Sequence, residues 1–588
     1  MNNINKVIIS LTSMIVGGIA SVFALPAMPG LLQASQPDGA IIDIFISGDE
    51  RNHIVYSNDG YILTNDNEGF YVFADVDANG NIMATNIREI NPARRSAETI
   101  KSLSRLDQKR IKSVMEKSFG ENEKGMMKGP GLRENQFPSY GEQKAIVILV
   151  EFLNKSFTIE NPNEYYHRML NEEGFSDYDA TGSARDYFIT NSLGKFKPEF
   201  DVYGPVKLDK YDNFYGMNDM WGKDVRPEKL VIDACKALDD EIDFSQYDRN
   251  EDGKIDNVYL FYAGYGEADG GGANTIWPHS WDLSQATFIE YYFDGVRLDH
   301  YACSNELKHG LNIPDGIGTF IHEFSHVMGL PDLYSTLYTG AFNPGSWNVL
   351  AHGPYNNNSR TPPNYSAFER YALDWMEPIV AEAGVKTLLP LGISNKAYLF
   401  LTEKENEYYL VENRQNEGFD TYLPSHGMLV WHVDYNEEAW ETNVVNNDVN
   451  HQRVDLVEAD NILTEDTRED DVFPGGANVT EFTCKSSPSF VSWAGKPLEY
   501  DICDIKETEA GEIIFNIVNC DASSVHVLKN AKSFIHINGN NVFAAGEGVE
   551  IYDVAGMLIT IINRESITLP QGIYLAVKGK ERVKFILP

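Results

Sequence analysis

The sequence predicts a multidomain α+β protein, and three observations lead to this fold class. The chain has 588 residues, enough for roughly three to five domains of ordinary size. Helical and strand patterns alternate up to about residue 378, whereas the segment 386–520 contains mainly strand patterns. The composition, 43% hydrophobic and 12% aromatic, is typical of a folded protein. The expected parts are a leader at 1–24, an N-terminal segment at 25–135, a mixed α/β domain at 140–380, a β-rich extension at 381–520 and a small C-terminal β-sandwich at 521–588.

Acidic residues dominate the charge of the chain. It has 87 Asp and Glu against 48 Lys and Arg, and a formal net charge of −39. A field of this sign repels a phosphate backbone, so nucleic acid is excluded as an expected partner. We expect the mature protein to be a monomer.

The five cysteines are too few for a disulfide scaffold. Cys235 can pair with Cys303, and two of Cys484, Cys503 and Cys520 can pair with each other. The spacing leaves these alternatives open. No cysteine precedes Cys235, so a thiol of the N-terminal segment cannot cap a metal ion.

The first 24 residues have the pattern of an export signal. Lys6 precedes an apolar stretch of about 17 residues from Val7 to Phe23. Val22-Phe23-Ala24 offers small side chains at the two positions that a signal peptidase reads, so we expect cleavage near Ala24. No other segment has the ~18 uninterrupted apolar residues of a membrane span. The sequence therefore predicts a secreted protein or one attached to the outer surface.

Short strands, one charged helix and a linker are expected in residues 25–135. Turn residues separate strands such as 41–46 and 71–74, and apolar residues recur at helical spacing from about 97 to 119. The stretch 120–143 is rich in Gly, Lys, Glu and Asn and contains Gly129-Pro130-Gly131. This stretch is an ordinary connection between domains, or it is the proteolytic site between a removable pro-segment and an enzyme.

Past the linker, the stretch 144–152 (KAIVILVEF) is a nearly continuous apolar run, which is typical of a buried strand. Strand patterns at 408–412, 428–433 and 513–518 define the β-rich extension.

The stretch 316–334 (GIGTFIHEFSHVMGLPDLY) carries the strongest chemical signal. His322 and His326 are four residues apart, so on a helix they project from one face and can bind one metal ion. Glu323 lies between them, where it can accept a proton from a metal-bound water.

Asp332 is the expected third metal ligand. Gly329 can adopt a left-handed helix cap and Pro331 prevents the helix from resuming, so the chain can turn back and bring Asp332 to the metal. Glu369, on an expected helix further along the chain, is the alternative ligand. Two imidazoles and one carboxylate leave a fourth position open, which is the arrangement of a catalytic Zn²⁺ site. Such a site activates water with Glu323 as the base, so the expected substrate is an amide, most plausibly a peptide bond.

The motif resembles the zinc signature of the immune-inhibitor-A-like metallopeptidases, a metzincin-related secreted family. The similarity extends from about residue 140 to 520, and the N-terminal stretch PGLLQASQPDG resembles the pro-segments of bacterial members. The resemblance implies a metzincin-like mixed α/β catalytic domain with a long active-site helix, with His322, His326 and Asp332 as zinc ligands and Glu323 as the base. The other stretches that carry it are WNVL at 347–350, YSAFERYALDW at 365–375, ENRQ at 412–415, WHVD at 431–434 and FPGG at 473–476.

Leu350 departs from the metzincin pattern. In that superfamily a Met occupies a tight turn beneath the zinc, and the aligned position here is Leu350. Leu and Met have similar volumes, so we expect an intact site with altered packing. Tyr355 is a candidate hydrogen-bond donor to the reaction oxyanion, and His352 is a similar candidate; both rank below the metal motif. A purely structural role is the simpler interpretation of both.

The stretch 248–256 (DRNEDGKID) resembles a calcium loop. Asp248, Asn250, Asp252, Lys254 and Asp256 fall at positions 1, 3, 5, 7 and 9 of an EF-hand, but position 12 lacks the usual Glu. The expected structural Ca²⁺ therefore needs a ligand from elsewhere; the alternative is a solvated turn before a strand.

Residues 549–585 of the last segment resemble the C-terminal sorting domain of type IX secretion substrates. The expected fold is a small sandwich of alternating strands joined by Gly turns. The resemblance implies passage through the outer membrane by the type IX machinery; the alternative is an accessory binding module.

The sequence as a whole predicts a secreted zinc endopeptidase that is made as a zymogen, inhibited by its own pro-segment, and that hydrolyses peptide bonds of extracellular proteins. One alternative is a zinc exopeptidase or amidase with the same metal. Another is a catalytically inactive, calcium-stabilised surface adhesin. The presence of Glu323 favours the enzyme, because a scaffold does not need a base at that position.

Overall fold

The computed structural model separates into two compact units, Met1–Cys520 and Asp521–Pro588. Among the described residues, no helix has the length and apolar character needed to cross a bilayer. Most of the expected leader and linker lies outside the described residues. Those residues are 23–587 without the gaps 50–51, 67, 78–79, 119–136, 220–221, 338–339, 521–534, 539–540, 545–547, 554–557, 564–565, 571 and 580.

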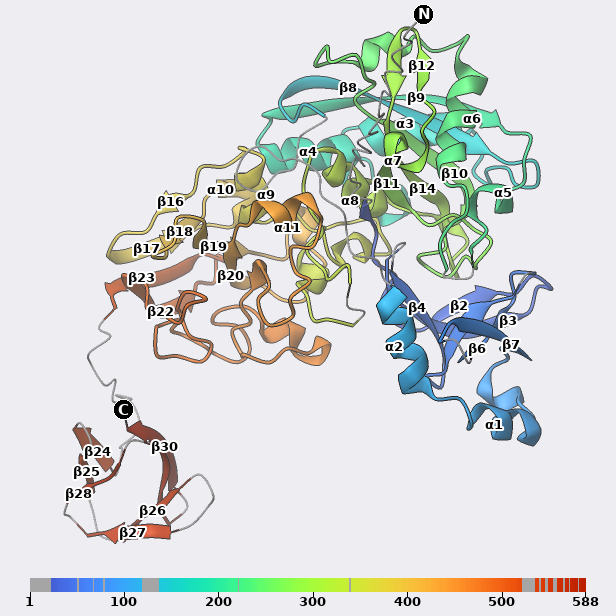
Figure 1. Ribbon diagram of the computed structural model, residues 1–588. Coiled ribbons are helices and arrows are strands. Elements are labelled where there is room, and N and C mark those ends of the chain that lie inside the picture. The colour runs from blue at the N-terminus through green and yellow to red at the C-terminus, as the bar shows by residue number, and fades with distance from the viewer. Residues whose placement is uncertain are drawn as a thin grey trace, which may run out of the picture. The chain divides into compact units, whose positions relative to one another are not determined.

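A mixed β-sheet with the strand order β1-β11-β14-β10-β8-β9 organises the first unit (Figure 1). β8, β9, β10 and β14 run parallel, whereas β11 is antiparallel to β14 and carries β1 antiparallel on its other side. The strands are β1 (Phe23–Ala24), β8 (Gly141–Glu151), β9 (Phe196–Lys207), β10 (Val258–Tyr265), β11 (His279–Asp282) and β14 (His300–Lys308), with β15 (Ile313–Pro314) paired to β14. The sheet therefore has an antiparallel edge at β11, and β1 covers that edge.

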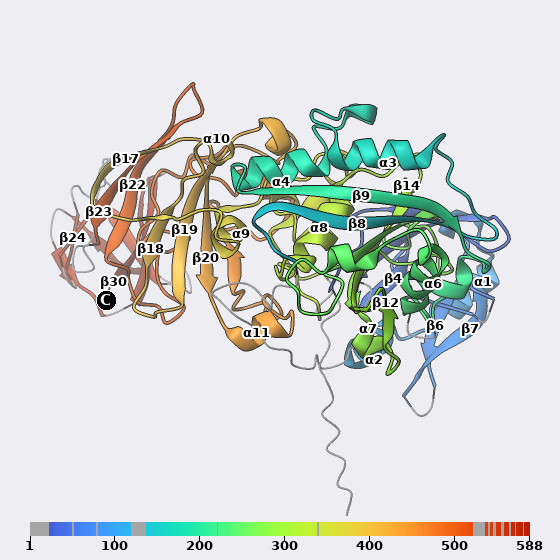
Figure 2. The same ribbon diagram turned by 90° about the horizontal axis from the view of Figure 1, so that it is seen from above.

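The side chains of β8 alternate between two hydrophobic cores. Val147 and Leu149 point into one core, and Ile146 and Ile148 into the other, which is why the predicted strand is apolar on both faces. Figure 2 shows α3 and α4 lying along β8 and β9. The helices of the first face are α3 (Pro162–Asn171), α4 (Ala184–Ser192) and α8 (Gly318–Val327), and the opposite face is covered by α6 (Glu228–Leu238).

The N-terminal segment forms a six-stranded antiparallel sheet whose strands follow one another in chain order. They are β2 (Leu32–Ser35), β3 (Ile41–Gly48), β4 (His53–Ser57), β5 (Ile62–Asn65), β6 (Tyr71–Val76) and β7 (Ile82–Arg88). Two helices follow, α1 (Ala97–Leu103) and α2 (Gln108–Ser118). The prediction of one helix from 97 to 119 is wrong, because α1 ends at Leu103 and Asp107 accepts the backbone N–H of Arg110 to begin a second helix.

The extension contains two sheets, with the orders β16-β18-β19-β20-β21 and β17-β23-β22. Val411 and Val430 of the first sheet pack against Ile502 and Phe515 of the second. The strands are β16 (Ile379–Val380), β17 (Gly384–Leu388), β18 (Tyr398–Leu401), β19 (Glu407–Arg414), β20 (Gly427–Asp434), β21 (Val454–Leu456), β22 (Tyr500–Glu507) and β23 (Ile513–Asn519).

The extension and the α/β domain share one hydrophobic core. The cluster that contains Phe320 and Phe324 of α8 also contains Leu410 of β19, Trp431 of β20 and Trp440 of α11 (Glu437–Glu441). All five side chains are fully buried. The two parts therefore form a continuous interior.

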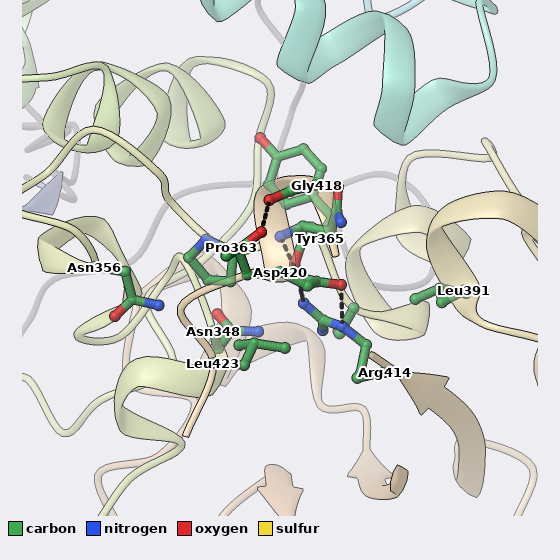
Figure 3. A network of polar contacts seen from close by, with 12 residues as sticks. Asn348, Asn356, Pro363, Tyr365, Leu391, Arg414, Gly418, Asp420 and Leu423 are labelled. Atoms are coloured by element: carbon green, nitrogen blue, oxygen red, sulfur yellow. Dashed lines mark hydrogen bonds and ion pairs between the residues drawn. The ribbon is translucent and has the colours of Figure 1, made fainter. Parts of the chain in front are cut away.

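A buried ionic network also joins the extension to the α/β domain. Figure 3 shows Arg414, at the end of β19, bonded to Asp420. The same guanidinium donates to Asn364 O at 3.0 Å and to Glu412 Oε1 at 3.2 Å. The other carboxylate oxygen of Glu412 accepts the backbone N–H of Ala367, which begins α9 (Ala367–Ala372). The ENRQ stretch that the sequence analysis singled out thus anchors β19 to α9.

The second unit contains two small antiparallel sheets, with the orders β24-β25-β28 and β27-β26-β29-β30. Val542 of β25 shares a buried cluster with Ile551 of β26 and Ala576 of β29. The strands are β24 (Ile535–Asn538), β25 (Asn541–Ala544), β26 (Val549–Asp553), β27 (Leu558–Ile562), β28 (Ser566–Thr568), β29 (Gly572–Lys578) and β30 (Glu581–Leu587).

Candidate metal centre

Helix α8 carries both histidines of the motif in the interior of the first unit. All ten of its residues are buried, and Phe320 and Phe324 fix it in the shared core. The helix is shorter than the long active-site helix that was expected. It ends directly after His326 because Gly329, with φ of 98°, is in the left-handed region and Pro331 follows it.

Three donor atoms converge beside this helix. His322 Nε2 and His326 Nε2 are 3.1 Å apart, and Asp332 Oδ1 lies 3.4 Å from the first and 3.2 Å from the second. A tetrahedral Zn²⁺ with bonds of about 2.0–2.1 Å holds its ligands roughly 3.3 Å from one another. The three residues present therefore have the spacing that such an ion requires.

Backbone carbonyl groups orient both imidazoles. His322 Nδ1 donates to Val349 O at 2.8 Å, and His326 Nδ1 donates to Leu330 O at 2.8 Å. With the proton on Nδ1, each ring presents the lone pair of Nε2 toward Asp332. This is the tautomer that a metal ligand needs.

Electrostatics favour an ionised Asp332. Burial alone would raise the pKa of Asp332, but the two neighbouring histidines outweigh burial and hold that pKa well below its ordinary value. Burial lowers the pKa of His326, and Asp332 only partly offsets the effect. The cluster therefore offers one carboxylate and two imidazole nitrogens, a donor set that suits a divalent cation.

Glu323 is fully buried next to these donors, and its Oε1 accepts a hydrogen bond from the backbone N–H of Leu25 at 3.0 Å. The contact joins residues 298 positions apart. Leu25 follows β1, and its carbonyl oxygen accepts a hydrogen bond from Trp277 Nε1 at 3.0 Å. The N-terminal segment thus passes directly over the side chain that was expected to act as the base.

Leu350 and Tyr355 have different surroundings. Leu350 is fully buried in the shared core, directly after Val349, the residue that binds His322. Tyr355 donates its hydroxyl proton to Pro26 O at 2.7 Å. Burial raises the pKa of Tyr355 well above its ordinary value, so the hydroxyl remains a donor.

His352 lines a cleft of about 850 Å³ together with Tyr355 and residues 26–30 of the N-terminal segment. Burial lowers the pKa of His352 to about 4, so this imidazole is neutral near pH 7. Both weaker candidates of the sequence analysis therefore lie at the cleft.

The structure places Glu369 away from the three donors. Its Oε2 accepts the backbone N–H of Ser366 at 2.7 Å as part of a capping box of α9, and its Oε1 accepts a hydrogen bond from Asn348 Nδ2. One carboxylate oxygen therefore caps α9, and the other links α9 to Asn348.

We expect Asp332→Ala to lower zinc affinity by about 10²-fold or more, because it removes one of three ligands. Glu369→Ala should leave zinc affinity unchanged and lower thermal stability through the lost helix cap. Zinc content after dialysis against a competing chelator measures the first effect. Loss of zinc only in the Glu369 variant would transfer the ligand role to that residue.

The expected calcium loop is folded around its own backbone. Asp248 accepts the N–H groups of Asp252 at 3.0 Å and of Gly253 at 2.9 Å. Asp256 is 3% exposed, and its Oδ1 has no hydrogen-bond partner. Burial, followed by the charges of Asp248 and Asp252, raises the pKa of Asp256 to about 7. Asn250 and Lys254 belong to the same loop. Asn250 Oδ1 accepts the backbone N–H of Asp252, and Asp252 Oδ1 accepts the backbone N–H of Lys254. In the described part of the chain, two groups of three possible metal ligands have their ligand atoms within 4.8 Å of one another. Neither group lies in this loop.

Sequence reasoning missed two sets of residues that contact the centre. One is Leu25 and Pro26, which touch Glu323 and Tyr355. The other is Asn443 of the extension, which hydrogen-bonds Asp332. Neither set has a local sequence pattern that points to the motif, because the contacts depend on the folded chain alone.

Comparison with known proteins identifies relatives of this region. Residues 139–380 match a family model described as the catalytic domain of immune inhibitor A, peptidase M6. The chain is 27% identical over 272 residues to Immune inhibitor A of Bacillus thuringiensis subsp. alesti, which covers 38% of each chain. It is also 27% identical over 217 residues to the pre-pro-metalloprotease PrtV of two Vibrio cholerae serotype O1 strains, which covers 33% of this chain and 24% of theirs.

The alignments thus span well under half of these relatives. The resemblance that the motifs predict is confirmed for residues 139–380, and the matched model does not extend to the extension or to the C-terminal unit. Over those residues the chain is similar to the catalytic domain of the immune-inhibitor-A metallopeptidases.

Proposed function

We propose that the protein is a zinc-dependent endopeptidase that is made as a zymogen and acts outside the cell on protein substrates. The observation that carries this proposal is the set of three donor atoms, 3.1 to 3.4 Å apart, next to a buried Glu323. His322, His326 and Asp332 would hold the ion. A bound Zn²⁺ would supply Lewis-acid chemistry that polarises the scissile carbonyl and activates water.

Glu323 is the proposed general base. Its Oε1 already accepts an N–H from the main chain of Leu25, a group that resembles the nitrogen of a peptide substrate. In the active enzyme the same oxygen would take a proton from water and deliver it to the leaving nitrogen. Tyr355, which donates to Pro26 O, is placed to donate to a substrate carbonyl that develops negative charge.

The edge of β11 supports an endopeptidase rather than an exopeptidase. β1 pairs with this edge, Leu25 lies at Glu323, and Pro26 continues to Tyr355. A chain can therefore extend on both sides of Glu323, with main-chain hydrogen bonds to β11 on one side. A peptide bond in the middle of a protein would fit this path.

The same contacts support latency. Leu25 and Pro26 lie where a substrate would lie, and Met28 N donates to Ala268 O at 3.0 Å. Glu323 and Tyr355 are both occupied by this segment. We therefore propose that residues 25–135 are a pro-segment and that activation requires their displacement, through cleavage in the linker. One relative carries the name pre-pro-metalloprotease, which fits a precursor of this kind.

Removing the metal tests the proposed function. We expect a strong chelator to abolish casein hydrolysis by the activated enzyme, and stoichiometric Zn²⁺ to restore it. Metal analysis should find one zinc per chain at this site. Unchanged hydrolysis after complete zinc removal would overturn the proposal.

Export and sorting are proposed from the sequence resemblances. The apolar leader would direct export, and residues 521–588 would engage the type IX machinery, for release or surface attachment. Deleting residues 521–588 should retain the protein inside a host that has this machinery. Secretion of the deleted form at the normal level would remove the sorting role.

A structural Ca²⁺ in the 248–256 loop is also proposed. Asp256 has an unpartnered, buried carboxylate oxygen beside the charges of Asp248 and Asp252, and a cation would relieve their repulsion. Extracellular millimolar calcium would suit a weak site of this kind.

Calcium affinity should depend on pH. The pKa of Asp256 is raised from 3.8 to about 7. Ionisation of this group therefore destabilises the folded protein, and this destabilisation grows as the pH rises from about 4 to about 7. Ca²⁺ would remove that cost, and protons would compete with it below pH 7. We expect the affinity to fall by up to about tenfold per pH unit below pH 7, and the calcium-induced rise in Tm to be larger at pH 8 than at pH 5.5. Asp256→Asn should remove this pH dependence, and an equal calcium response at both pH values would contradict the site.

A further inference from the structure

We propose that Asn443 is a positioning residue for the ligand Asp332, so that the β-rich extension completes the metal centre. This inference rests on the proposed metallopeptidase function. Asn443 Oδ1 accepts the backbone N–H of Asp332 at 2.8 Å, and Asn443 Nδ2 donates to Asp332 Oδ2 at 2.6 Å. Both residues are 1% exposed. One amide therefore binds the main chain and the side chain of the same ligand.

This pair of hydrogen bonds decides which carboxylate oxygen faces the histidines. Oδ2 of Asp332 is occupied by Asn443, whereas Oδ1 accepts no hydrogen bond and lies 3.2 to 3.4 Å from the two Nε2 atoms. A carboxylate held at both its backbone and one oxygen cannot rotate about its side-chain bonds. Outer groups that orient a ligand in this way typically change metal affinity 10- to 100-fold.

Asn443 is itself held from two sides. It adopts a left-handed conformation with φ of 53° directly after α11, a conformation that Asn tolerates better than most residues. Its N–H donates to Trp440 O, and its carbonyl oxygen accepts the hydroxyl of Thr336 at 3.0 Å. Trp440 belongs to the core that also contains Phe324 of α8. The amide is therefore fixed relative to the metal helix.

A neutral amide suits this position for an electrostatic reason. It provides a hydrogen bond to Asp332 Oδ2 without adding a charge to the cluster. An Asp at 443 would have nearly the same shape, but it would lose the N–H donor and place a second carboxylate 2.6 Å from Oδ2. Asn443→Asp therefore keeps almost the same side-chain volume but replaces the hydrogen bond to Asp332 by repulsion between two carboxylates.

Asn447 offers a matched control on the same loop. Its Oδ1 accepts the backbone N–H of Thr336 and the hydroxyl of Ser335 at 3.1 Å, and it is also buried. Like Asn443, it ties the extension to the segment that follows α8. Its hydrogen bonds go to Ser335 and Thr336 rather than to Asp332, so its loss should affect folding without a direct effect on the ligand.

Zinc affinity of the full chain tests the inference, by competition with a chromophoric chelator. Asn443→Ala and Asn443→Asp should bind zinc about 10- to 100-fold more weakly than wild type. Asn447→Ala should bind zinc like wild type, even where it unfolds at a similarly reduced temperature. The d–d absorption of the Co²⁺-substituted protein should change in the Asn443 variants alone.

The outcomes separate this inference from the proposed function. Equal zinc affinity and equal Co²⁺ spectra in wild type and the Asn443 variants would overturn the positioning role and leave the metal site standing. Equal losses in the Asn443 and Asn447 variants would also overturn it, because a general structural effect would then explain both. A wild-type chain that binds no zinc would overturn the proposed function itself. Where Asn443→Ala does not fold, Asn443→Asp provides the comparison.

A separate observation concerns two cysteines of the extension, and we infer that Cys484 and Cys520 form a disulfide. Their Sγ atoms are 2.7 Å apart, although the residues are 36 positions apart in sequence. Cys484 N–H donates to Asp501 Oδ1 at 2.7 Å, and Cys520 N–H donates to Glu499 O at 2.8 Å. Both sulfur-bearing residues are partly exposed, so an oxidant can reach them.

A metal ion is the rival occupant, because Asp501 lies with the two thiols in a group of possible ligands. Burial, followed by Cys484 and Asp501, raises the pKa of Cys520 to about 12. Metal ligation needs thiolates, whereas a disulfide carries no charge beside the Asp501 carboxylate. The chemistry therefore favours the disulfide. Two S–H bonds break and one S–S bond forms, and the two electrons and two protons pass to the disulfide of a thiol oxidoreductase, which becomes a dithiol.

Peptide mapping of the exported full chain tests this inference, after alkylation without reduction. We expect a peptide cross-linked between Cys484 and Cys520, and alkylation of Cys503. Cys503→Ser should keep the cross-link, and Cys520→Ser should abolish it. Alkylation of both Cys484 and Cys520 without reduction would overturn the inference, and so would a zinc ion that Cys520→Ser removes.

Discussion

Replacing Glu323 by Gln is expected to lower kcat for peptide hydrolysis by about 10²- to 10⁴-fold while zinc remains bound. The amide has the shape of the carboxylate but cannot take a proton from water. The three proposed metal ligands are other side chains, so the substitution removes the proposed base and should leave their positions unchanged. Zinc content and casein hydrolysis, measured on the activated enzyme, give the two readouts.

Glu369→Gln is the matched control for this variant, because Glu369 is an equally buried carboxylate that binds Ser366 and Asn348 rather than the centre. It should retain most of the activity. Full activity of the Glu323 variant would remove the base from the proposed mechanism. Loss of zinc from that variant would mean that Glu323 supports the ligands as well.

Displacement of the N-terminal segment is expected to raise activity by about 10²- to 10³-fold. An attached inhibitor acts at an effective concentration on the order of millimolar. Even with a micromolar intrinsic dissociation constant, blocked sites would therefore outnumber open sites by about 10³ to 1. The contacts to be broken are Leu25 to Glu323 and Pro26 to Tyr355. Hydrolysis of a short fluorogenic peptide, before and after controlled cleavage in the linker, measures the gain.

Deleting residues 25–28 from the intact precursor should give much of the same activation without any cleavage. The control is a full-length precursor in which Ala replaces a residue that makes none of these contacts, such as the exposed Pro29. A precursor that is as active as the cleaved form would contradict latency. A deleted precursor that remains silent would place the inhibition elsewhere in the segment.

Local sequence patterns predicted the parts of the molecule that depend on neighbouring residues. The apolar run at 144–152 became the buried strand β8, because its alternate side chains face two cores. The turn at Gly329 and Pro331 was expected to bring Asp332 back toward the histidines, and the structure places it there. In contrast, the break between α1 and α2 was missed, because apolar spacing continues across the polar residues that cap the second helix.

Contacts between distant segments left no local signal. Asn443 and Asp332 are 111 positions apart, and Leu25 and Glu323 are 298 positions apart. A lone Asn after a short helix has many possible roles, and only the folded chain shows that its amide meets a ligand. The pairing of Cys484 with Cys520 was one of several open alternatives for the same reason, since spacing does not determine which strands become neighbours.

The covering of β11 by β1 has a consequence for the colloidal behaviour of the mature enzyme. Cleavage of the leader near Ala24 removes β1, and the outer main-chain donors and acceptors of β11 then lose the partners that β1 supplies. Bare strand edges readily recruit other extended chains and promote association between molecules. The form without the leader should therefore tolerate high concentration less well than the form that retains it, and a bound extended peptide should restore its solubility.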